Sequence, residues 1–215
     1  MHPLQPVRQD QRLIWAESDD DLWILHRSNI VSDSLWEFIE ECRRQGPGPD
    51  ERLALLRGEL SRRSLPEVVQ FQVRLDGATH EASTWDLWAA ADRIFGGWCS
   101  DDGFCYFRLW MVGLGREAFS RAVADAPEVR RLVGRPREMW NDDWPGWESL
   151  DYVATEAYGV LTGVDDDCGD AFYEAVEAEQ GDGEGSSRPL GRRWDVRRED
   201  EAARRLPRLS VMSPL

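Results

Sequence analysis

The chain has 215 residues, of which 41% are hydrophobic and eleven are tryptophan, so it can bury the core of one domain with appendages. Its 41 acidic residues outnumber 26 basic ones, all of them arginine, and the resulting net charge of −15 disfavours nucleic-acid binding. The same sign of charge permits a peptide, a protein or a cationic small molecule as partner.

Residues 1–31 are predicted to form an N-terminal extension. Two short apolar runs, Leu13–Trp15 and Leu22–Leu25, flank an acidic run at Glu17–Asp21. Apolar runs on either side of a polar turn predict a small β-hairpin, and a short helix is the alternative. The remainder is predicted to be all-α, a mainly helical single domain with its core over residues 32–178.

Three amphipathic helices are predicted to follow the extension. The first begins at Ser34, where Glu37 completes a capping box, and Gly46-Pro47-Gly48-Pro49 ends it. Asp50 is the predicted cap of the second helix, and another capping box at Ser64 opens the third. The positions at helical spacing that should face the core are Leu35, Phe38, Ile39, Cys42, Leu53, Leu56, Leu60, Val68, Val69, Phe71, Gln72 and Leu75.

The central stretch Trp85–Glu117 is predicted to form a helix, a tight polar turn and a second helix. Thr84 or Ser83 can cap the first helix, and Gly96-Gly97 should end it, because glycine adopts the left-handed conformation without a Cβ clash. Both helices carry apolar residues on two faces, so each is expected to be buried on two sides. The second helix is expected to continue through Arg116–Ala124.

A thiol, a hydroxyl and two carboxylates follow one another in the central turn, at Cys99, Ser100, Asp101 and Asp102. Ser100 or Asp101 would cap the second helix by accepting hydrogen bonds from its free N–H groups. Alternatively, the four side chains form a catalytic site with a nucleophile or a general acid and base. The helix terminus would lower the pKa of Cys99 and the carboxylates would raise it, and the sequence leaves this balance open.

Arg108 completes the predicted catalytic set. It lies among aromatic residues, so we expect it to be buried and to require a carboxylate partner. The candidates are Asp86, Asp92, Asp101 and Asp102. One interpretation is a structural ion pair that joins the two central helices. The other is a pocket in which Arg108 binds the anionic group or carboxylate of a ligand.

Tryptophan is concentrated in the central helix and in a later loop. Three tryptophans occur within Trp140–Trp147, where proline, glycine and the absence of helical spacing predict a loop. Its rings should either pack on the core or line a pocket for a cation, with nearby acids as the complement. The predicted ligand-binding side chains are Trp85, Trp88, Trp98, Trp140, Asp142, Asp143, Trp144 and Trp147.

Charge is unevenly distributed in the last third of the chain. Residues 140–187 contain fourteen Asp and Glu and no Arg, whereas residues 188–212 contain eight Arg and four acids. The Gly, Ser and acidic residues of 179–192 predict a linker. We expect a basic C-terminal helix at residues 193–212 to pack back on the core, against the acidic segment.

The cysteines and histidines show no metal-binding pattern. Cys42, Cys99, Cys105 and Cys168 form no Cys-x-x-Cys pair, and the three histidines are scattered. The run Asp165–Asp170 lacks the spacing and the closing glutamate of a calcium loop. We therefore predict no metal and no cofactor. Because the chain shows no signal sequence and no run of ~20 apolar residues, we expect a cytoplasmic protein with reduced thiols and no membrane partner.

The central motif is close to that of a known group of bacterial proteins. It comprises Trp85-Asp86-Leu87-Trp88, Gly96-Gly97, Cys99-Ser100-Asp101-Asp102-Gly103-Phe104, Tyr106-Phe107-Arg108 and Gly115-Arg116-Glu117. Later pieces are Tyr152-Val153-Ala154, Glu156-Ala157-Tyr158 and Arg204-Arg205-Leu206-Pro207-Arg208-Leu209. With these motifs, residues 33–210 resemble the bacterial domain of unknown function family 4240. The resemblance implies a mostly helical domain and no particular activity.

Two positions depart from the family pattern. Trp98 stands where the family usually has a small residue, and Cys105 stands where it often has an acid. If that acid belongs to a shared site of the family, its role is lost or altered in this chain.

Two functions are consistent with these observations. The first is a binding or accessory protein for a peptide or protein partner, because the sequence shows no metal spacing, phosphate loop or catalytic triad. The second is a small metal-independent tailoring enzyme with a pocket at the Cys99–Asp102 turn between the central helices. The sequence decides neither the partner nor the oligomeric state.

Overall fold

The computed structural model describes residues 34–133, 145–163, 169–181, 188–213 and 215, and the backbone of residues 6–9 and 12–15. The predicted all-α class is confirmed. The helices are residues 34–45, α2 (Pro49–Leu60), α3 (Leu65–Glu81), α4 (Trp85–Ile94), α5 (Asp101–Gly113), α6 (Arg116–Ala124), α7 (Val129–Val133), α8 (Val153–Thr162), α9 (Asp170–Gln180), α10 (Glu199–Arg205) and α11 (Pro207–Met212), with 3-10 turns η1 (Ala126–Glu128) and η3 (Glu148–Leu150). None of the described helices has the length and apolarity that crossing a membrane requires.

Two short strands precede the helices. β1 (Pro6–Gln9) and β2 (Arg12–Trp15) pair antiparallel. The predicted hairpin has Leu13–Trp15 as its first arm and Leu22–Leu25 as its second. The structure pairs the first arm with residues that precede it, whereas the second arm lies outside the described residues. The hairpin around Glu17–Asp21 therefore stays a prediction.

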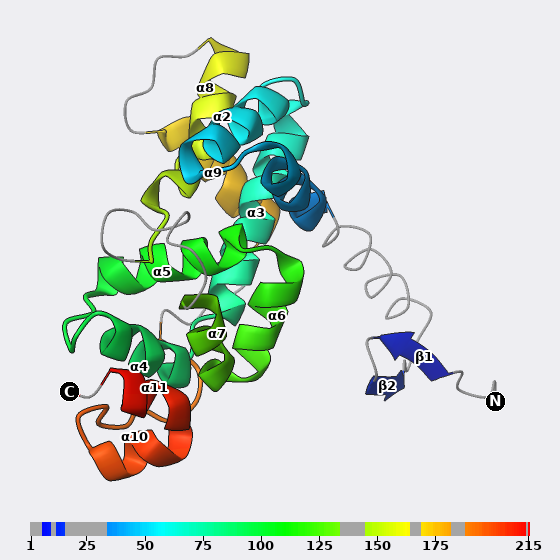
Figure 1. Ribbon diagram of the computed structural model, residues 1–215. Helices are drawn as coiled ribbons and strands as arrows, with labels where there is room; N and C mark the ends of the chain where they lie inside the picture. The colour runs from blue at the N-terminus through cyan, green and yellow to red at the C-terminus, as the bar shows by residue number, and fades with distance from the viewer. Residues whose placement is uncertain are drawn as a thin grey trace, which may run out of the picture.

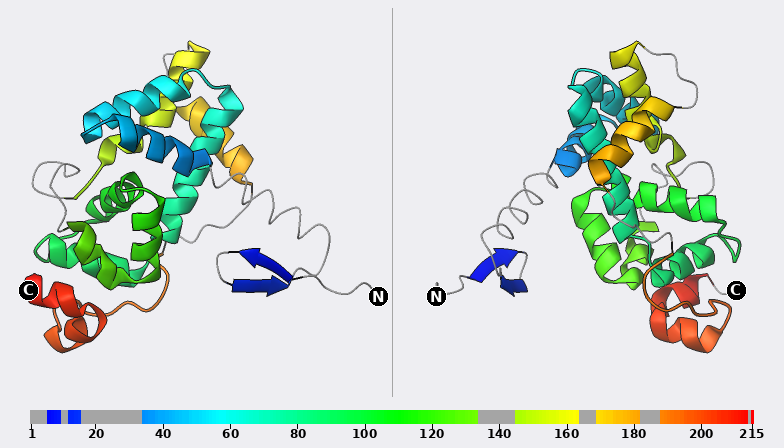
Figure 2. Two further views of the ribbon diagram at one scale, coloured as in Figure 1. Left: turned by 45° about the vertical axis from the view of Figure 1, so that its right-hand side comes forward. Right: turned by 180° about the vertical axis from the view of Figure 1, so that it is seen from behind.

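The long helix α3 runs through the helical body (Figure 1). The helices α2, α8 and α9 gather around its N-terminal part, and α4 to α7 lie toward its C-terminal end. Figure 2 shows α9 beside α3, and the pair α10 and α11 at the end of the body where α4 lies. One hydrophobic core connects the helices at both ends of α3 and contains Phe71, Leu75, Phe107, Trp110 and Phe119. The C-terminal turns of α3 thereby reach α4 and α5, where the candidate site lies.

Local sequence signals set several helix starts. The Ser64 N–H donates to Glu67 Oε2 at 2.9 Å, which confirms the capping box of α3. The predicted start of α2 is wrong by two residues. Gly48 is the N-cap, so Asp50 lies in the first turn and caps nothing. Pro49 explains the shift, because its fixed φ and missing N–H suit the first helical position.

The helices α4 and α5 are the predicted central pair. Thr84 caps α4 by accepting a hydrogen bond from Leu87 N–H at 3.1 Å. The helix stops before Gly97, which has a φ of 89° and donates its N–H to the Asp92 carbonyl at 2.7 Å. The expectation that both faces of α4 are buried is wrong. The face of Trp85 and Trp88 is half-buried, because it borders two hollows.

Two predicted helices are interrupted. The second central helix does not continue into α6, because Gly115 between them has φ 93° and ψ 164°, which no helix contains. The C-terminal basic helix is also shorter than predicted. Residues 193–198 are not helical, and the helix breaks before Pro207, whose missing N–H cannot continue α10. Among the described elements, α11 packs on α4 and η1, whereas the expected contact was with the acidic segment.

Candidate functional site

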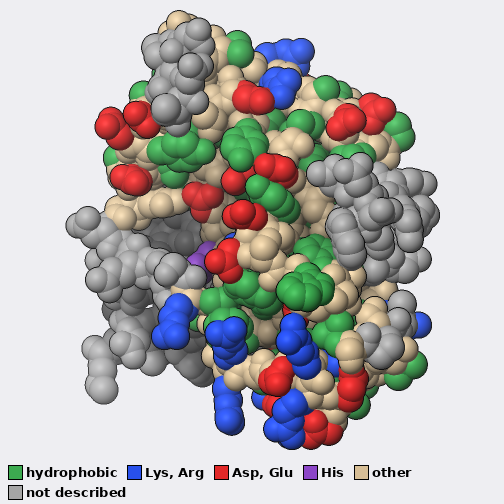
Figure 3. Space-filling view, turned by 90° about the vertical axis from the view of Figure 1, so that its left-hand side faces the viewer, with side chains coloured by type: hydrophobic (Ala, Val, Ile, Leu, Met, Phe, Trp, Pro, Cys, Tyr) green, Lys and Arg blue, Asp and Glu red, His purple; other side chains and the backbone are tan. Residues whose placement is uncertain are grey.

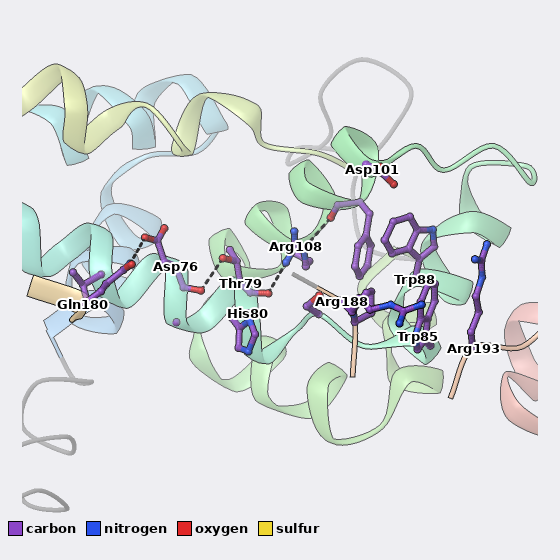
Figure 4. Close-up of a pocket in the computed structure, with 15 residues that line it drawn as sticks. Asp76, Thr79, His80, Trp85, Trp88, Asp101, Arg108, Gln180, Arg188 and Arg193 are labelled. Carbon is purple, nitrogen blue, oxygen red and sulfur yellow. Dashed lines mark hydrogen bonds between the residues drawn. The ribbon is translucent and has the colours of Figure 1, made fainter. Parts of the chain in front are cut away.

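A row of aromatic rings with a guanidinium group at each end lies beside the start of α4 (Figure 4). The Trp85 and Trp88 ring centroids are 5.6 Å apart, and Trp88 lies 4.5 Å from Phe104 of α5. The Arg193 guanidinium carbon lies 5.0 Å from the Trp85 centroid, and that of Arg108 lies 4.9 Å from the Phe104 centroid. Both distances are within the range of cation–π attraction. The helical spacing of Trp85 and Trp88 places them on one face, and the Thr84 cap fixes where that face begins.

A hollow of about 830 Å³ opens in front of this row. Its described lining comes from α3, α4, α5, the end of α9 and residues 188–193. The lining residues are Val73, Asp76, Gly77, Thr79, His80, Ser83, Trp85, Trp88, Asp101, Phe104, Arg108, Gln180, Arg188, Pro189 and Arg193. Figure 3 shows this face of the molecule, with arginines gathered below the hollow and acidic side chains above it.

A smaller hollow of about 390 Å³ adjoins the larger one. The two share Trp85, Trp88, Asp101 and Arg193 as walls. The other described residues of the smaller hollow are Ala89, Asp92, Cys99, Trp194 and Val196. Because they share these walls, we call the two hollows together the tryptophan trough.

The segment before α10 forms one wall of the trough through backbone pairing. Leu190 N–H donates to the Ser83 carbonyl at 2.7 Å, and Trp85 N–H donates to the Leu190 carbonyl at 3.0 Å. This pairing brings Arg188 and Arg193 to the trough. The predicted linker of residues 179–192 includes Arg188, and the predicted basic helix of residues 193–212 includes Arg193. A pairing between segments about 105 positions apart leaves no local signal in the sequence.

The predicted environment of Arg108 is wrong. Arg108 is half-buried, and its Nη1 donates to the Thr79 carbonyl of α3 at 2.9 Å. Within the described residues it forms no ion pair with any of the four predicted aspartates. The Thr79 carbonyl lies near the end of α3, where carbonyls lack helical partners, so it accepts the hydrogen bond that a carboxylate was expected to accept.

The buried arginine of the central pair is Arg93, which sequence reasoning missed. Its side chain is 1% exposed. It donates to the carbonyls of Ser213 at 2.9 Å and Val196 at 2.8 Å, and its Nη2 lies 3.1 Å from a carboxylate oxygen of Glu199. The neighbouring Asp86 accepts a hydrogen bond at 2.8 Å from the indole of Trp194. These polar contacts attach the C-terminal segment to α4.

The Cys99–Asp102 turn caps α5 and contains a thiol with a raised pKa. Ser100 Oγ accepts a hydrogen bond from Gly103 N–H at 3.0 Å, so this hydroxyl caps α5. Burial, and then the charges of Asp92 and Asp101, raise the pKa of Cys99 to about 12. The thiol is therefore protonated near neutral pH and is a poor nucleophile. Asp101 and Asp102 are exposed in the first turn of α5, where they complement the helix dipole.

The structure brings together only part of the predicted catalytic set. Asp101 lines both hollows, with Arg108 beside it in the larger one and Cys99 in the smaller one, and neither Ser100 nor Asp102 is among the described lining of either hollow. Three of the five predicted residues therefore border the trough, and no one hollow contains all three.

The predicted tryptophan ligand set also divides. Trp85 and Trp88 line the trough, whereas Trp98 is 83% exposed on the surface outside it. Trp147 is 4% exposed and donates its backbone N–H to the Tyr106 carbonyl at 3.1 Å, so its ring belongs to the core. The other loop residues, Trp140, Asp142, Asp143 and Trp144, lie outside the described part of the chain.

Two aspartates that interact with each other were not predicted as site residues. They are Asp76, which lines the larger hollow, and Asp151. Asp76 of α3 accepts hydrogen bonds from the amides of Gln72 at 2.8 Å and Gln180 at 2.7 Å, and burial raises the pKa of Asp76. Burial, and then the charge of Asp76, raise the pKa of Asp151, whereas the positive charge of Arg108 lowers it. Single aspartates on two separate segments carry no motif, so the sequence could not pair them. Within the described residues no group of His, Cys, Asp and Glu could hold a metal ion.

Comparison with known proteins places the chain in a family. The model of the protein of unknown function family DUF4240 matches residues 31–159, and the chain therefore belongs to this family. The match covers a shorter stretch than the expected residues 33–210. It includes the aromatic row and Arg108, whereas Arg188 and Arg193 lie beyond it. No curated protein and no solved structure matches the chain.

Proposed function

We propose that this protein is a bacterial, cytoplasmic binding or accessory protein that recognises a peptide or protein partner through the tryptophan trough. The observation that supports this proposal is the continuity of the two hollows across Trp85 and Trp88. Partly exposed aromatic rings with flanking charges are typical of recognition surfaces, where a ring supplies apolar area at low conformational cost.

The dimensions of the trough favour a peptide. The larger hollow alone has about 830 Å³, near the upper end of small-molecule sites, and the smaller hollow extends it. Both signs of charge occur along it, with Arg108 and Arg193 among the cations and Asp92 and Asp101 among the anions. An elongated ligand with alternating side chains can use apolar and charged walls at once.

Selection of peptides on the immobilised protein tests the proposal. Random decapeptides displayed on phage would be selected, synthesised and titrated against the protein and two variants. Trp88→Ala should weaken binding roughly tenfold or more, as expected when a central aromatic contact is removed. The matched control is Trp98→Ala, which removes an exposed tryptophan outside the trough and should leave affinity unchanged.

The proposal fails if no peptide is retained, or if Trp88→Ala binds every selected peptide as tightly as the parent protein. Circular dichroism of Trp88→Ala would first establish that the variant is folded. The acidic loop residues Asp142 and Asp143 stay a predicted second contact. For them, charge reversal should weaken partner binding in a salt-dependent way.

The alternative function is a small metal-independent tailoring enzyme. One observation favours it, namely that the smaller hollow is lined by Asp92, Cys99 and Asp101 at the predicted turn. The raised pKa of Cys99 argues against a thiolate nucleophile there. Under this alternative, Asp101→Asn would remove a biological phenotype while the fold survives.

A further inference from the structure

The described lining of the larger hollow contains more arginines than carboxylates, in contrast to the acidic chain as a whole. Arg108 from α5 and Arg188 and Arg193 from the C-terminal segment line it, against Asp76 and Asp101. The whole chain carries a net charge of −15, so a cationic surface here is not a consequence of composition. Three arginines from two distant stretches meet at one hollow, which favours an anionic ligand at this end of the trough.

Among the described residues, neither carboxylate of the hollow forms an ion pair with Arg193. Asp76 already accepts hydrogen bonds from two amide groups, those of Gln72 and Gln180. Asp101 is exposed at the first turn of α5 and belongs to both hollows. A ligand anion placed against Arg193 would therefore meet donors that these carboxylates do not occupy.

Arg193 has the geometry of an anion-binding group. Its guanidinium lies over the Trp85 ring, and among the described residues no hydrogen bond or ion pair joins this guanidinium to a protein acceptor. A planar guanidinium held by an aromatic ring presents its N–H edge to a carboxylate, which can accept two parallel hydrogen bonds. Val73, Pro189 and the aromatic row provide apolar walls beside it.

We infer that the larger hollow binds a carboxylate carried next to an aromatic ring, with Arg193 holding the carboxylate and the aromatic row holding the ring. This inference rests on the proposed function and names the chemistry that the trough recognises. Two sources supply this chemistry, the carboxyl-terminal aromatic residue of a peptide and a free aromatic acid.

Three small probes that share the phenylalanine side chain test the inference on the full-length protein. N-acetylphenylalanine carries the carboxylate, N-acetylphenylalaninamide is its neutral counterpart, and phenylalaninamide carries a positive charge. Binding would be followed by saturation-transfer NMR and by quenching of tryptophan fluorescence. We expect the acid to bind roughly tenfold more tightly than the neutral amide, as for loss of one charged hydrogen-bonded pair, and the cation to bind most weakly.

Two variants test whether the tighter binding of the acid than of the neutral amide depends on Arg193. Arg193→Gln should reduce the preference for the acid over the neutral amide to less than twofold, while binding of the amide stays unchanged. Arg192→Gln is the matched control, because Arg192 is an exposed neighbour that does not line the hollow, and its preference should equal that of the parent. The inference is overturned if the amide or the cation binds as tightly as the acid, or if Arg193→Gln leaves the preference intact.

The outcome separates this inference from the proposed function. Peptides that bind through Trp88 without any preference for a carboxylate would overturn the inference and leave the proposed function standing. If the acid binds, no displayed peptide does, and acetyl-Gly-Gly-Phe binds no more tightly than the acid, the proposed function fails and the carboxylate site stands. A tighter complex with acetyl-Gly-Gly-Phe than with N-acetylphenylalanine identifies a peptide terminus as the source, and equal affinity identifies a free aromatic acid.

Discussion

Cys99 shows how the surroundings of one side chain decide its chemistry. The helix terminus next to it favours the thiolate, whereas burial and two aspartates favour the thiol. The structure decides the balance, because these opposing effects together raise the pKa to about 12. The sequence shows the helix start and the aspartates, but it does not show how deeply Cys99 is buried, and burial is the largest cause of the raised pKa.

We predict that Cys99 is slow to react with iodoacetamide near neutral pH. Because the thiolate forms only as pH rises toward about 12, labelling at pH 7.5 should be at least ~100-fold slower than in urea, and should accelerate about tenfold per pH unit up to pH 10. Peptide-resolved mass spectrometry measures each cysteine separately, with a Cys99→Ser variant to assign the signal. Fast labelling at neutral pH would instead reveal an activated thiol and favour the enzyme alternative.

At the scale of elements, the break between α5 and α6 depends on one backbone conformation. Gly115 has φ 93° and ψ 164°, a region that is almost restricted to glycine. A Cβ at this position would also meet the side chains of Arg43 and Glu40. The Glu40 carboxylate accepts the Arg116 N–H at 3.1 Å, so the first turn of α6 is joined to the helix of residues 34–45.

Gly115→Ala should therefore lower the free energy of unfolding by roughly 1–3 kcal/mol, the usual cost of a residue in such a region. Gly58→Ala is the matched control. It lies inside α2 with nothing within 4 Å of an added Cβ, and alanine favours helix there by up to ~1 kcal/mol. Urea denaturation compares the two variants with the parent. Equal midpoints for Gly115→Ala and the parent would show that the break does not require glycine.

At the scale of the whole molecule, the C-terminal segment joins the body through a buried polar contact. Arg93 is fully enclosed, and its hydrogen bonds run to residues more than 100 positions later. Ala89 and Ala90 of α4 pack with Leu206 and Leu209 in a second small core beside it. Arg188 and Arg193 reach the trough from the same segment, so its attachment also completes the proposed binding site.

Arg93→Ala should lower the free energy of unfolding by roughly 2–4 kcal/mol, because it leaves a void and two carbonyls without their donor. The half-exposed Glu199 limits the loss, since water can solvate its carboxylate. The control is Arg198→Ala, which removes an exposed arginine paired with Asp200 and should leave the urea midpoint unchanged. Equal stability of Arg93→Ala and Arg198→Ala would show that the C-terminal segment is not held through Arg93.

Residue type and spacing were sufficient to predict the helical class, the family, the capping box at Ser64 and the cap at Ser100. These features depend on residues within one or two turns of one another, so spacing and residue type are sufficient to predict them. Three features depend on the tertiary structure, namely the half-buried face of Trp85 and Trp88, the acceptor to which Arg108 donates, and the burial of Arg93. Each depends on a segment far along the chain, and local patterns carry no information about which distant carbonyl or ring will be there. The same reason explains why the trough, built from α3, α4, α5 and residues 188–193, could not be recognised before the chain was folded.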